Sequence, residues 1–406
     1  MKLTVQAVSK FTLLFAAIVL TSGAYADGDE ADLRVGKGYI DFRLRYEGVS
    51  QDNARQDANA LTLRTLLGYQ TKVYSGWSGT LELEDVRIIG GVDEYSVPPP
   101  VNFNPGIYSI VLDPETTEVD QAFVKYAHDK IWGKLGRQVI THDKWRFVGD
   151  VRWRQDRQTF DALRFFYTPS KSISLDYSYV TKRNRVLAEA ADQRSKDHLL
   201  KGDWKTSPGT LGAYAYLLER DDDTDNSLDT YGLRFAGETE LTSVKLLYTL
   251  EYATQDFKLN TVKNSADYSF VEGGAGFKGI TAKLGYEVLG SDNGNYGFST
   301  PLATLHAFNG WADQFVITPI VGLEDVYIAV GGKLIGGKWL IVYHDFSADK
   351  PSATVNDLGS ELDLRYVYPF MKRYTVGIKY AAYSAGDAAA GRVNTDKLWV
   401  WMTAKF

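Results

Sequence analysis

The stretch that decides the fold is Asp396–Phe406, DKLWVWMTAKF, at the C-terminal end of the sequence. Successive side chains of an extended chain point to opposite faces, so this segment divides into two sets. One set is apolar: Leu398, Val400, Met402, Ala404 and Phe406. The other set is polar and aromatic: Lys397, Trp399, Trp401, Thr403 and Lys405. The alternation predicts a strand with one apolar face. An edge strand of a soluble β-sandwich would alternate in the same way.

Segments with the same alternation recur along almost the whole chain. Near the N-terminus, for example, Ile40 and Phe42 fall on one face while Asp41 and Arg43 fall on the other. About eighteen such segments of roughly ten residues are present, which is the length that a tilted transmembrane strand needs. They cover 39–48, 60–73, 77–88, 118–127, 131–139, 158–167, 172–182, 196–205, 209–219, 228–238, 243–254, 265–277, 279–289, 324–333, 337–346, 358–368, 373–384 and 396–406.

The connections between these segments alternate between short and long. Short ones include 73–77, 206–208, 278–279, 334–337 and 369–372, whereas long ones cover 89–117, 140–157, 183–195, 255–264, 290–323, 347–357 and 385–395. Long loops on one side are typical of outer-membrane barrels, which have tight periplasmic turns and extended extracellular loops. We therefore predict an all-β transmembrane antiparallel barrel of about 18 strands, wide enough for a water-filled channel unless loops fold into it.

Composition agrees with a membrane barrel and argues against several other classes. Aromatic residues make up 13% of the chain, and the mean hydropathy is −0.24. Mean hydropathy does not identify a membrane barrel, because every second residue of a strand faces water in the lumen. The chain contains no cysteine, so it has no disulfide framework and no thiolate metal site. Its formal net charge of −6 argues against nucleic acid as a partner.

The N-terminus indicates the compartment. Lys2 and Lys10 precede a short apolar run over 11–20, and Ala24-Tyr25-Ala26 follows as an A-x-A cleavage pattern. The pattern predicts a secretory signal peptide, and its apolar core is too short for a membrane-spanning helix. We expect cleavage after Ala26 and a location in the outer membrane of a Gram-negative cell. The predicted division is a signal peptide over 1–26, a short periplasmic segment over 27–38 and the barrel over 39–406.

Two of the long connections contain more aromatic residues than exposed loops usually carry. They include 142–161 and 298–315, and their content predicts that both fold inward and pack. Together with neighbouring motifs they make the sequence similar to the alginate-export family of outer-membrane β-barrel porins. The segments that carry the resemblance are Gln121-Ala122-Phe123, Gly136-Arg137-Gln138, Gly149 with Arg152-Trp153-Arg154-Gln155, and Leu305–Phe315.

The resemblance implies a passive channel whose lumen carries an arginine-rich constriction suited to a polyuronate. The alginate-secreting members of the family are longer and have an extended periplasmic turn that acts as a lid. This sequence has no such turn, which argues against polymer secretion. We therefore expect a passive channel for small solutes, with anionic sugars or uronate oligosaccharides as the first candidates. A general, weakly selective diffusion porin is the alternative, and an outer-membrane enzyme or adhesin is the third hypothesis.

The candidate selectivity residues are basic side chains that face the lumen by parity or stand where strands meet the inward loops. They are Arg43, Arg45, Arg64, Lys125, Arg137, Arg152, Arg154, Arg164 and Arg365, with Trp153, His306 and Trp311 in the constriction loops. A guanidinium can hold a carboxylate through two hydrogen bonds, and a ring of such groups lowers the barrier for anions. Alternatively, the cations pair with lumenal acids as a structural lining; these acids are Asp41, Glu47, Glu82, Glu84, Asp161, Asp176, Glu361 and Asp363. The tryptophans either stack on sugar rings or pack the loops against the wall.

Other chemistries have weak support in the sequence. Residues 221–226 carry carboxylates at alternating positions, as a calcium loop does, but Gly232 stands where the bidentate glutamate belongs. His142-Asp143 and His344-Asp345 are adjacent in sequence, and in a strand such neighbours point to opposite faces. We therefore expect no catalytic residue, no metal site and no cofactor.

The expected partners are those of a barrel in the outer membrane. They are membrane lipid and lipopolysaccharide, the barrel-assembly machinery, and small anionic or saccharide solutes. The terminal strand resembles the C-terminal strand of bacterial outer-membrane barrels, which the assembly machinery recognises. Phe406 is therefore predicted to be the assembly signal.

Overall fold

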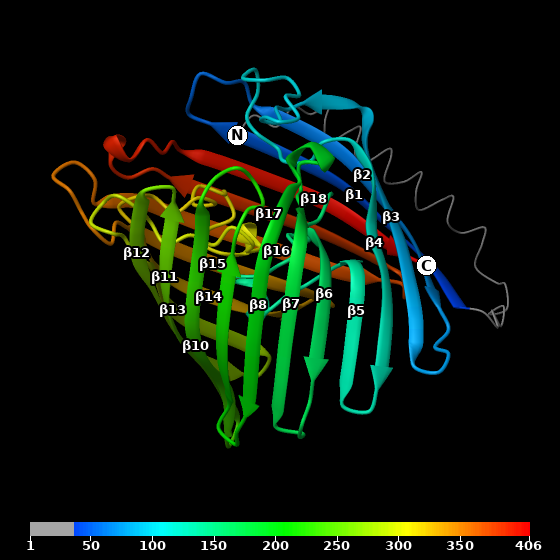
Figure 1. Ribbon diagram of the computed structural model, residues 1–406. Coiled ribbons are helices and arrows are strands. Elements are labelled where there is room, and N and C mark those ends of the chain that lie inside the picture. Colours follow the sequence, from blue (N-terminus) through cyan, green and yellow to red (C-terminus); the bar gives the residue numbers. More distant parts are fainter. Residues whose placement is uncertain (1–35) are drawn as a thin grey trace.

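Eighteen antiparallel strands form one closed sheet in the computed structural model, which describes residues 36–406 (Figure 1). Each strand pairs with its neighbours in sequence, and the first strand also pairs with the last, which closes the barrel. This confirms the predicted all-β antiparallel barrel. The strands are β1 (Gly36–Gln51), β2 (Ala58–Thr71), β3 (Trp77–Glu94), β4 (Thr116–His128), β5 (Ile131–Gln138), β6 (Thr159–Tyr167), β7 (Ile173–Asn184), β8 (Gln193–Lys205), β9 (Thr210–Leu218), β10 (Asn226–Leu241), β11 (Val244–Leu259), β12 (Val262–Phe277), β13 (Ile280–Leu289), β14 (Leu323–Leu334), β15 (Gly337–Ser347), β16 (Asp357–Phe370), β17 (Tyr374–Ser384) and β18 (Thr395–Lys405).

The strands lie where the alternation predicted them, and their ends differ by a few residues. β1 begins at Gly36, so the last residues of the predicted periplasmic segment belong to the barrel, while the predicted signal peptide lies outside the described residues. The prediction of a long loop over 255–264 was wrong. The chain turns there through Asn260 and Thr261 alone, between β11 and β12. Asn260 has a φ of 54°, a left-handed conformation that asparagine tolerates in tight hairpins.

The two faces of the sheet differ in chemistry, as period-two alternation requires. The outer face carries exposed apolar side chains such as Leu135, Leu233 and Leu284, which are 64%, 58% and 61% exposed. Large apolar groups exposed at this level over a whole barrel wall indicate contact with lipid. The inner face is polar and charged, which explains the low mean hydropathy of a membrane protein.

Closure of the barrel uses the last residue of the chain. β1 and β18 pair from Asp41 opposite Lys405 to Gln51 opposite Thr395. Beyond this ladder the Ile40 N–H donates to the Phe406 carbonyl at 3.1 Å, and the Phe406 N–H donates to the Ile40 carbonyl at 2.9 Å. The terminal residue therefore completes the seam between the first and last strands.

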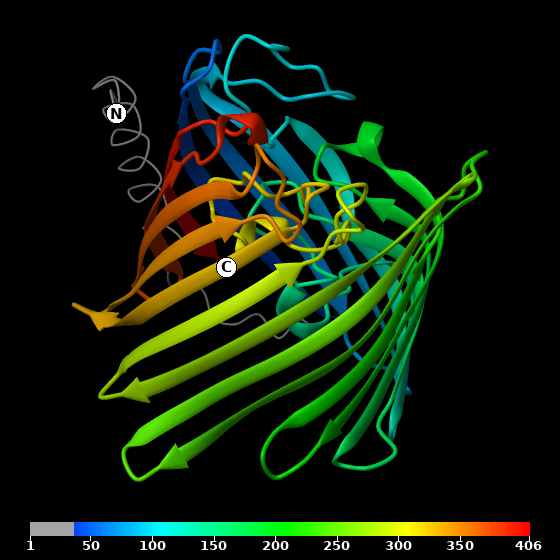
Figure 2. The same cartoon turned by 90° about the vertical axis from the view of Figure 1, so that its left-hand side faces the viewer.

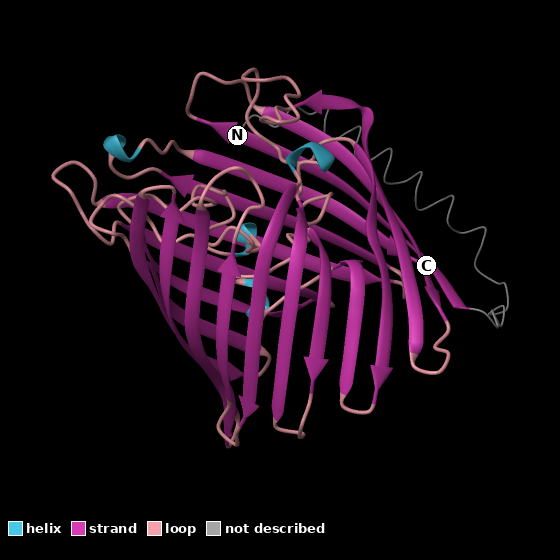
Figure 3. Cartoon of the chain, in the orientation of Figure 1, coloured by secondary structure: helices cyan, strands magenta, loops and turns pink. Residues whose placement is uncertain are grey.

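Short and long connections separate to opposite ends of the barrel, as Figure 3 shows. The turns that follow the even-numbered strands are short, and we call this rim the short-turn end. The other rim is the long-loop end. Its connections contain the short helices η2 (Asp143–Trp145), η3 (Glu189–Ala191), η4 (Leu305–Ala307) and η5 (Ala388–Ala390). Within residues 36–406 no helix is long and apolar enough to cross a membrane.

Two of the long loops leave the rim and fold into the barrel. They are the β5–β6 loop over 139–158 and the β13–β14 loop over 290–322, and Figure 2 shows the second inside the ring of strands. The largest buried apolar cluster joins these loops to the inner wall through residues such as Phe147, Phe298 and Tyr268. The predicted inward folding of the aromatic-rich connections is therefore what the structure shows.

Candidate functional site

The two inward loops meet each other inside the lumen. Val148 and Leu302 form a parallel bridge, and the Gly149 N–H donates to the Leu302 carbonyl at 2.8 Å. The backbones approach so closely that a Cβ at Gly149 would lie 2.3 Å from the Thr304 hydroxyl and 2.8 Å from its backbone nitrogen. Only glycine allows this approach without displacing a loop. The loops therefore form one constriction rather than two independent lids.

Two arginines of β1 hold the β5–β6 loop against the wall. Arg43 donates from Nε to Gln155 Oε1 at 2.8 Å, from Nη1 to the Arg152 carbonyl at 2.8 Å, and from Nη2 to the Arg154 carbonyl. Arg45 donates to the Trp153 carbonyl and forms an ion pair with Asp113. Both arginines are buried, and most of their donors are taken up by these contacts, although Arg45 Nε has no partner among the described residues. Their position fastens the loop instead of presenting free charge to a solute.

Arg154 connects both loops to the wall. Its Nη1 lies 3.0 Å from Glu47 Oε2, and its Nη2 lies 2.9 Å from Asp313 Oδ2. Asp313 also accepts from Lys397 at 2.7 Å. Burial opposes charge on Arg154, but Glu47 and Asp313 outweigh it and raise the pKa of the guanidinium above its ordinary value. Burial likewise acts against the Asp313 carboxylate, yet His306 and Lys397 hold its pKa well below the usual range.

His306 lies at the centre of the constriction. Its ring stacks on Trp153 with centroids 5.2 Å apart, and Nδ1 lies 2.7 Å from Asp313 Oδ1. Nε2 lies 2.6 Å from Lys379 Nζ, so one of these two nitrogens donates to the other. Burial keeps the pKa of His306 well below its usual value, although Asp313 opposes this effect. Burial thus disfavours the protonated ring in the docked loop.

The far wall holds the loops through a second set of buried contacts. Arg146 donates from Nε to Glu287 Oε1 at 2.6 Å. The Ala312 N–H donates to Glu361 at 2.7 Å, and the Trp311 N–H donates to Asp363 at 3.3 Å. Carboxylates of β13 and β16 thus anchor segments that began on opposite sides of the barrel. The constriction spans the lumen and is tied to it on both sides.

A cavity of about 250 Å³ stays open beside the constriction, along the inner wall of β10–β15. Its charged lining is mixed: Lys144, Arg234 and Lys283 face Glu251, Glu272 and Asp325. Arg234 lies 3.2 Å from Glu251, and Lys283 lies 2.9 Å from Glu272. The charged side chains in this part of the lumen are nearly balanced in sign and lie among aromatic and aliphatic neighbours.

The structure brings together only part of the predicted selectivity set. Arg43, Arg45 and Arg154 lie at the constriction with Trp153, His306 and Trp311. The three arginines form ion pairs with carboxylates or hydrogen bonds to backbone carbonyls, as the structural-lining alternative describes. Arg152 is 52% exposed and contacts only Asp150 of its own loop within ion-pair distance among the described residues. Elsewhere on the inner wall, Arg64 lies 2.9 Å from Asp41, and Arg164 pairs with Asp176.

Lys125 and Arg365 lie nearer the short-turn end. Among residues 36–406, neither has a carboxylate within ion-pair distance. Arg365 is exposed, and its guanidinium lies 5.8 Å from the Trp311 ring.

Arg137 is placed differently from the prediction. β5 continues as a strand through Gln138, so alternation gives Arg137 the face of Leu135 and not that of Lys134. Its partner across the ladder is Asp161, at 2.8 Å, while Leu135 pairs with the exposed Leu163. The prediction put Arg137 at the constriction because it lies at a strand end beside the inward loop, and it did not follow the alternation of that strand. The structure puts this side chain on the outer face, near the long-loop end.

Several constriction residues were not among the predicted set. Arg157 pairs with Asp120 and Glu82, Lys379 contacts His306 and three tryptophan rings, and Arg146 pairs with Glu287. Lys379 lies on the inner face of β17 opposite Trp399 and could have been found by parity. Arg146 and Arg157 occupy the same aromatic-rich loop as Trp153, but their partners are more than 35 residues away in sequence. Nothing local to either residue identifies those partners.

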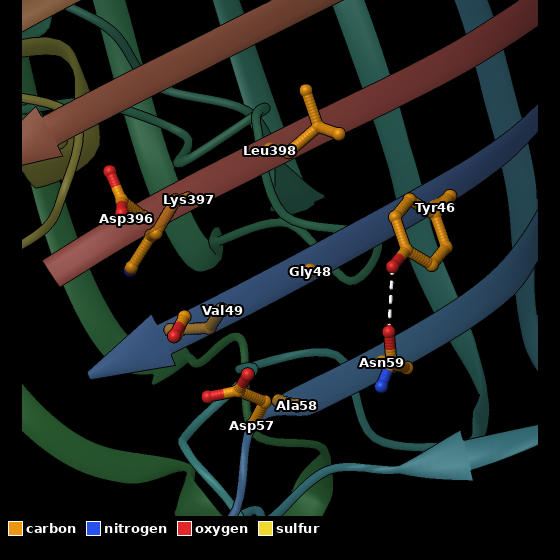
Figure 4. Close-up of a pocket in the computed structure, with 10 residues that line it drawn as sticks. Tyr46, Gly48, Val49, Asp57, Ala58, Asn59, Asp396, Lys397 and Leu398 are labelled. Atoms are coloured by element: carbon orange, nitrogen blue, oxygen red, sulfur yellow. Dashed lines mark hydrogen bonds between the residues drawn. The ribbon is translucent and has the colours of Figure 1, made fainter. Parts of the chain in front are cut away.

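A second hollow lies on the outer wall and is unrelated to the channel. Figure 4 shows that Tyr46, Gly48, Asn59 and Leu398 contribute to it, and the Tyr46 hydroxyl donates to Asn59 Oδ1 at 2.7 Å. By alternation, Tyr46 faces away from Arg45 and hence away from the lumen. Within residues 36–406, no group of three or more His, Asp or Glu side chains could hold a metal ion.

Comparison with known proteins agrees with the geometry. The family model described as alginate export matches residues 38–288. Among solved structures, OccAB4 of Acinetobacter baumannii is similar with a TM-score of 0.72 at 14% identity, over 91% of this chain and 98% of that chain. OccAB1 of the same organism has a TM-score of 0.72 at 13% identity, over 94% and 99% of the two chains. The outer membrane protein opdK from Pseudomonas aeruginosa has a TM-score of 0.70 at 11% identity, over 91% and 98%. The comparison with curated proteins gives no match.

Proposed function

Since the chain belongs to the alginate export family and folds as an outer-membrane porin, we propose that it is a passive channel for small anionic solutes, with uronate oligosaccharides as the first class to test. The short-turn end of such a barrel faces the periplasm and the long-loop end faces the exterior. A solute would cross by diffusion through water, with its rate set by the pore radius and the lumenal charges. We assign no catalytic residue to this chain.

The charge of the lumen between the constriction and the periplasmic turns carries the proposal. Inner-face positions there follow from the strand register and alternation. The basic residues at these positions are Lys37, Lys125, Lys134, Arg164, Lys201, Lys205, Arg234, Lys245, Lys283, Lys333, Lys338, Arg365 and Lys405. The acidic residues are fewer: Asp41, Glu82, Glu84, Asp176, Asp203, Glu238, Glu240, Glu251 and Glu272. An excess of fixed positive charge in a narrow aqueous space concentrates anions and repels cations.

A general, weakly selective porin remains the second candidate, and one observation favours it. The cations closest to the constriction are neutralised, since Arg154 pairs with Glu47 and Asp313 and Arg45 pairs with Asp113. If the narrowest section governs selection, its near-neutral lining gives only weak discrimination between ions.

Single-channel recording of the purified protein in a planar bilayer separates the two candidates. With a potassium chloride gradient, the proposal predicts a reversal potential shifted toward the chloride equilibrium potential. It also predicts that alginate oligomers added at the periplasmic face block the current. A reversal potential near zero with no block would instead favour the general porin. Absence of any conductance would reject both.

A further inference from the structure

Three cations lie side by side on the inner wall near the periplasmic turns. Lys125 of β4 is directly opposite Lys134 of β5, which is directly opposite Arg164 of β6. The neighbouring row, Val124–Leu135–Leu163, is apolar and exposed on the outer face, so alternation turns the three cations into the lumen. Like charges directly opposite each other in a sheet are destabilising. The row therefore needs neighbouring groups that offset this repulsion.

Half of the other cations of the periplasmic half have a carboxylate partner. Lys201 contacts Asp143 and Asp203, and Lys283 contacts Glu272 at 2.9 Å. In the row itself, Arg164 pairs with Asp176. No carboxylate of residues 36–406 lies within 4.0 Å of the Lys125 or Lys134 ammonium. The row thus has two adjacent uncompensated positive charges that face water.

An aromatic platform lies within reach of these charges. Trp132 stacks on Phe166 with centroids 5.2 Å apart and planes at 13°. Its ring centroid lies 5.4 Å from the Lys125 ammonium, 5.8 Å from that of Lys134 and 5.3 Å from the Arg164 guanidinium carbon. Trp132 is half-buried, so part of its side chain stays accessible. Cation–π attraction lowers the electrostatic cost of the row without neutralising it.

We propose that Lys125, Lys134 and Trp132 form a binding subsite for carboxylates attached to a ring, on the path between the constriction and the periplasm. This proposal rests on the proposed channel function. Neighbouring strands are about 4.8 Å apart, so ammonium groups on adjacent strands can approach one carboxylate from two sides. The ring of the ligand then lies on the indole, as sugar or aromatic rings do on tryptophan. A sugar acid and an aromatic acid share this chemistry, whereas acetate offers the charge alone.

The test uses single-channel recordings of the full barrel in potassium chloride, with glucuronate, benzoate or acetate added at the periplasmic face. The subsite predicts that glucuronate or benzoate blocks current at lower concentration than acetate. Trp132→Ala should weaken the block by the ring-bearing anion by a factor of about 2–10 and leave the effect of acetate unchanged. Lys125→Gln with Lys134→Gln should weaken the block by every anion.

The matched control is the pair Lys333 and Lys338, which are also directly opposite each other on the inner face at a periplasmic turn. Lys333→Gln with Lys338→Gln removes the same charge, and among residues 36–406 neither ammonium makes a cation–π contact, unlike those of Lys125 and Lys134. This variant should keep the ring-dependent block. Equal block by all three anions, or equal loss in both double variants, would overturn the subsite. The chloride conductance of the same channels tests the proposed function separately.

Discussion

Replacing Arg154 by methionine tests whether ion pairs hold the two inward loops docked in the lumen. The substitution keeps the unbranched stem of the side chain and removes the hydrogen bonds to Glu47, at 3.0 and 3.2 Å, and to Asp313, at 2.9 Å. Removing one partner of a buried ion pair costs about 3–5 kcal/mol. We expect a cost at the lower end of this range, because both carboxylates keep a second cation. Asp313 still pairs with Lys397, and Glu47 still lies 3.5 Å from Arg45.

A loss of about 3 kcal/mol lowers the ratio of docked to undocked loop by about a hundredfold. We expect Arg154→Met channels to show frequent transitions to a larger conductance in planar bilayers, while the wild type stays in one level. Arg152→Met is the control, because this side chain is 52% exposed and its contact with Asp150 is worth under about 1 kcal/mol. A folded Arg154→Met barrel with wild-type conductance and transitions would refute the clamp and assign the docking to apolar packing.

Four further predictions test other parts of the account. The docked His306 excludes a proton that an undocked loop would bind, so docking should weaken as the pH falls below about 6.5, and His306→Gln should abolish this pH dependence of the conductance transitions. Gly149→Val should separate the loops through its clash with Thr304 and raise the conductance; an unchanged value would mean that the loops do not need their mutual contact. Deletion of Phe406 should lower the yield of heat-modifiable barrel on gels, because the residue closes the seam. Arg137→Gln should leave the reversal potential unchanged, and a shift toward cations would contradict its outward position.

The barrel itself could be predicted because its determinants are local and periodic. In Asp396–Phe406 every second residue is apolar, and β18 has that alternation in the structure. The same argument located all of the strands and, through the alternation of connection lengths, the two ends of the barrel. The wrong assignment of 255–264 as a long loop came from polar residues that a hairpin turn accommodates as readily as a loop.

Parity alone would also have placed Arg137 correctly. The prediction assigned this residue to the constriction from its place at a strand end, whereas the alternation that continues through Gln138 gives it the outer face. Parity correctly gives Lys125 and Arg164 to the lumen, but only the register shows that Lys134 lies directly between them. Pairing across strands is a long-range property that no single segment contains.

The sequence by itself determined the strand pattern, the inward folding of two aromatic-rich loops and the family, because each depends on neighbouring residues. Only the tertiary structure decided which charges are free. Arg154 and Glu47 are 107 residues apart, and Arg154 and Asp313 are 159 apart, so their neutralisation depends on how a loop docks across the lumen. Lys125 and Lys134 keep their charge because the same folding brings them no acidic partner from residues 36–406. An electrostatic field depends on distances in space, and sequence spacing does not fix those distances.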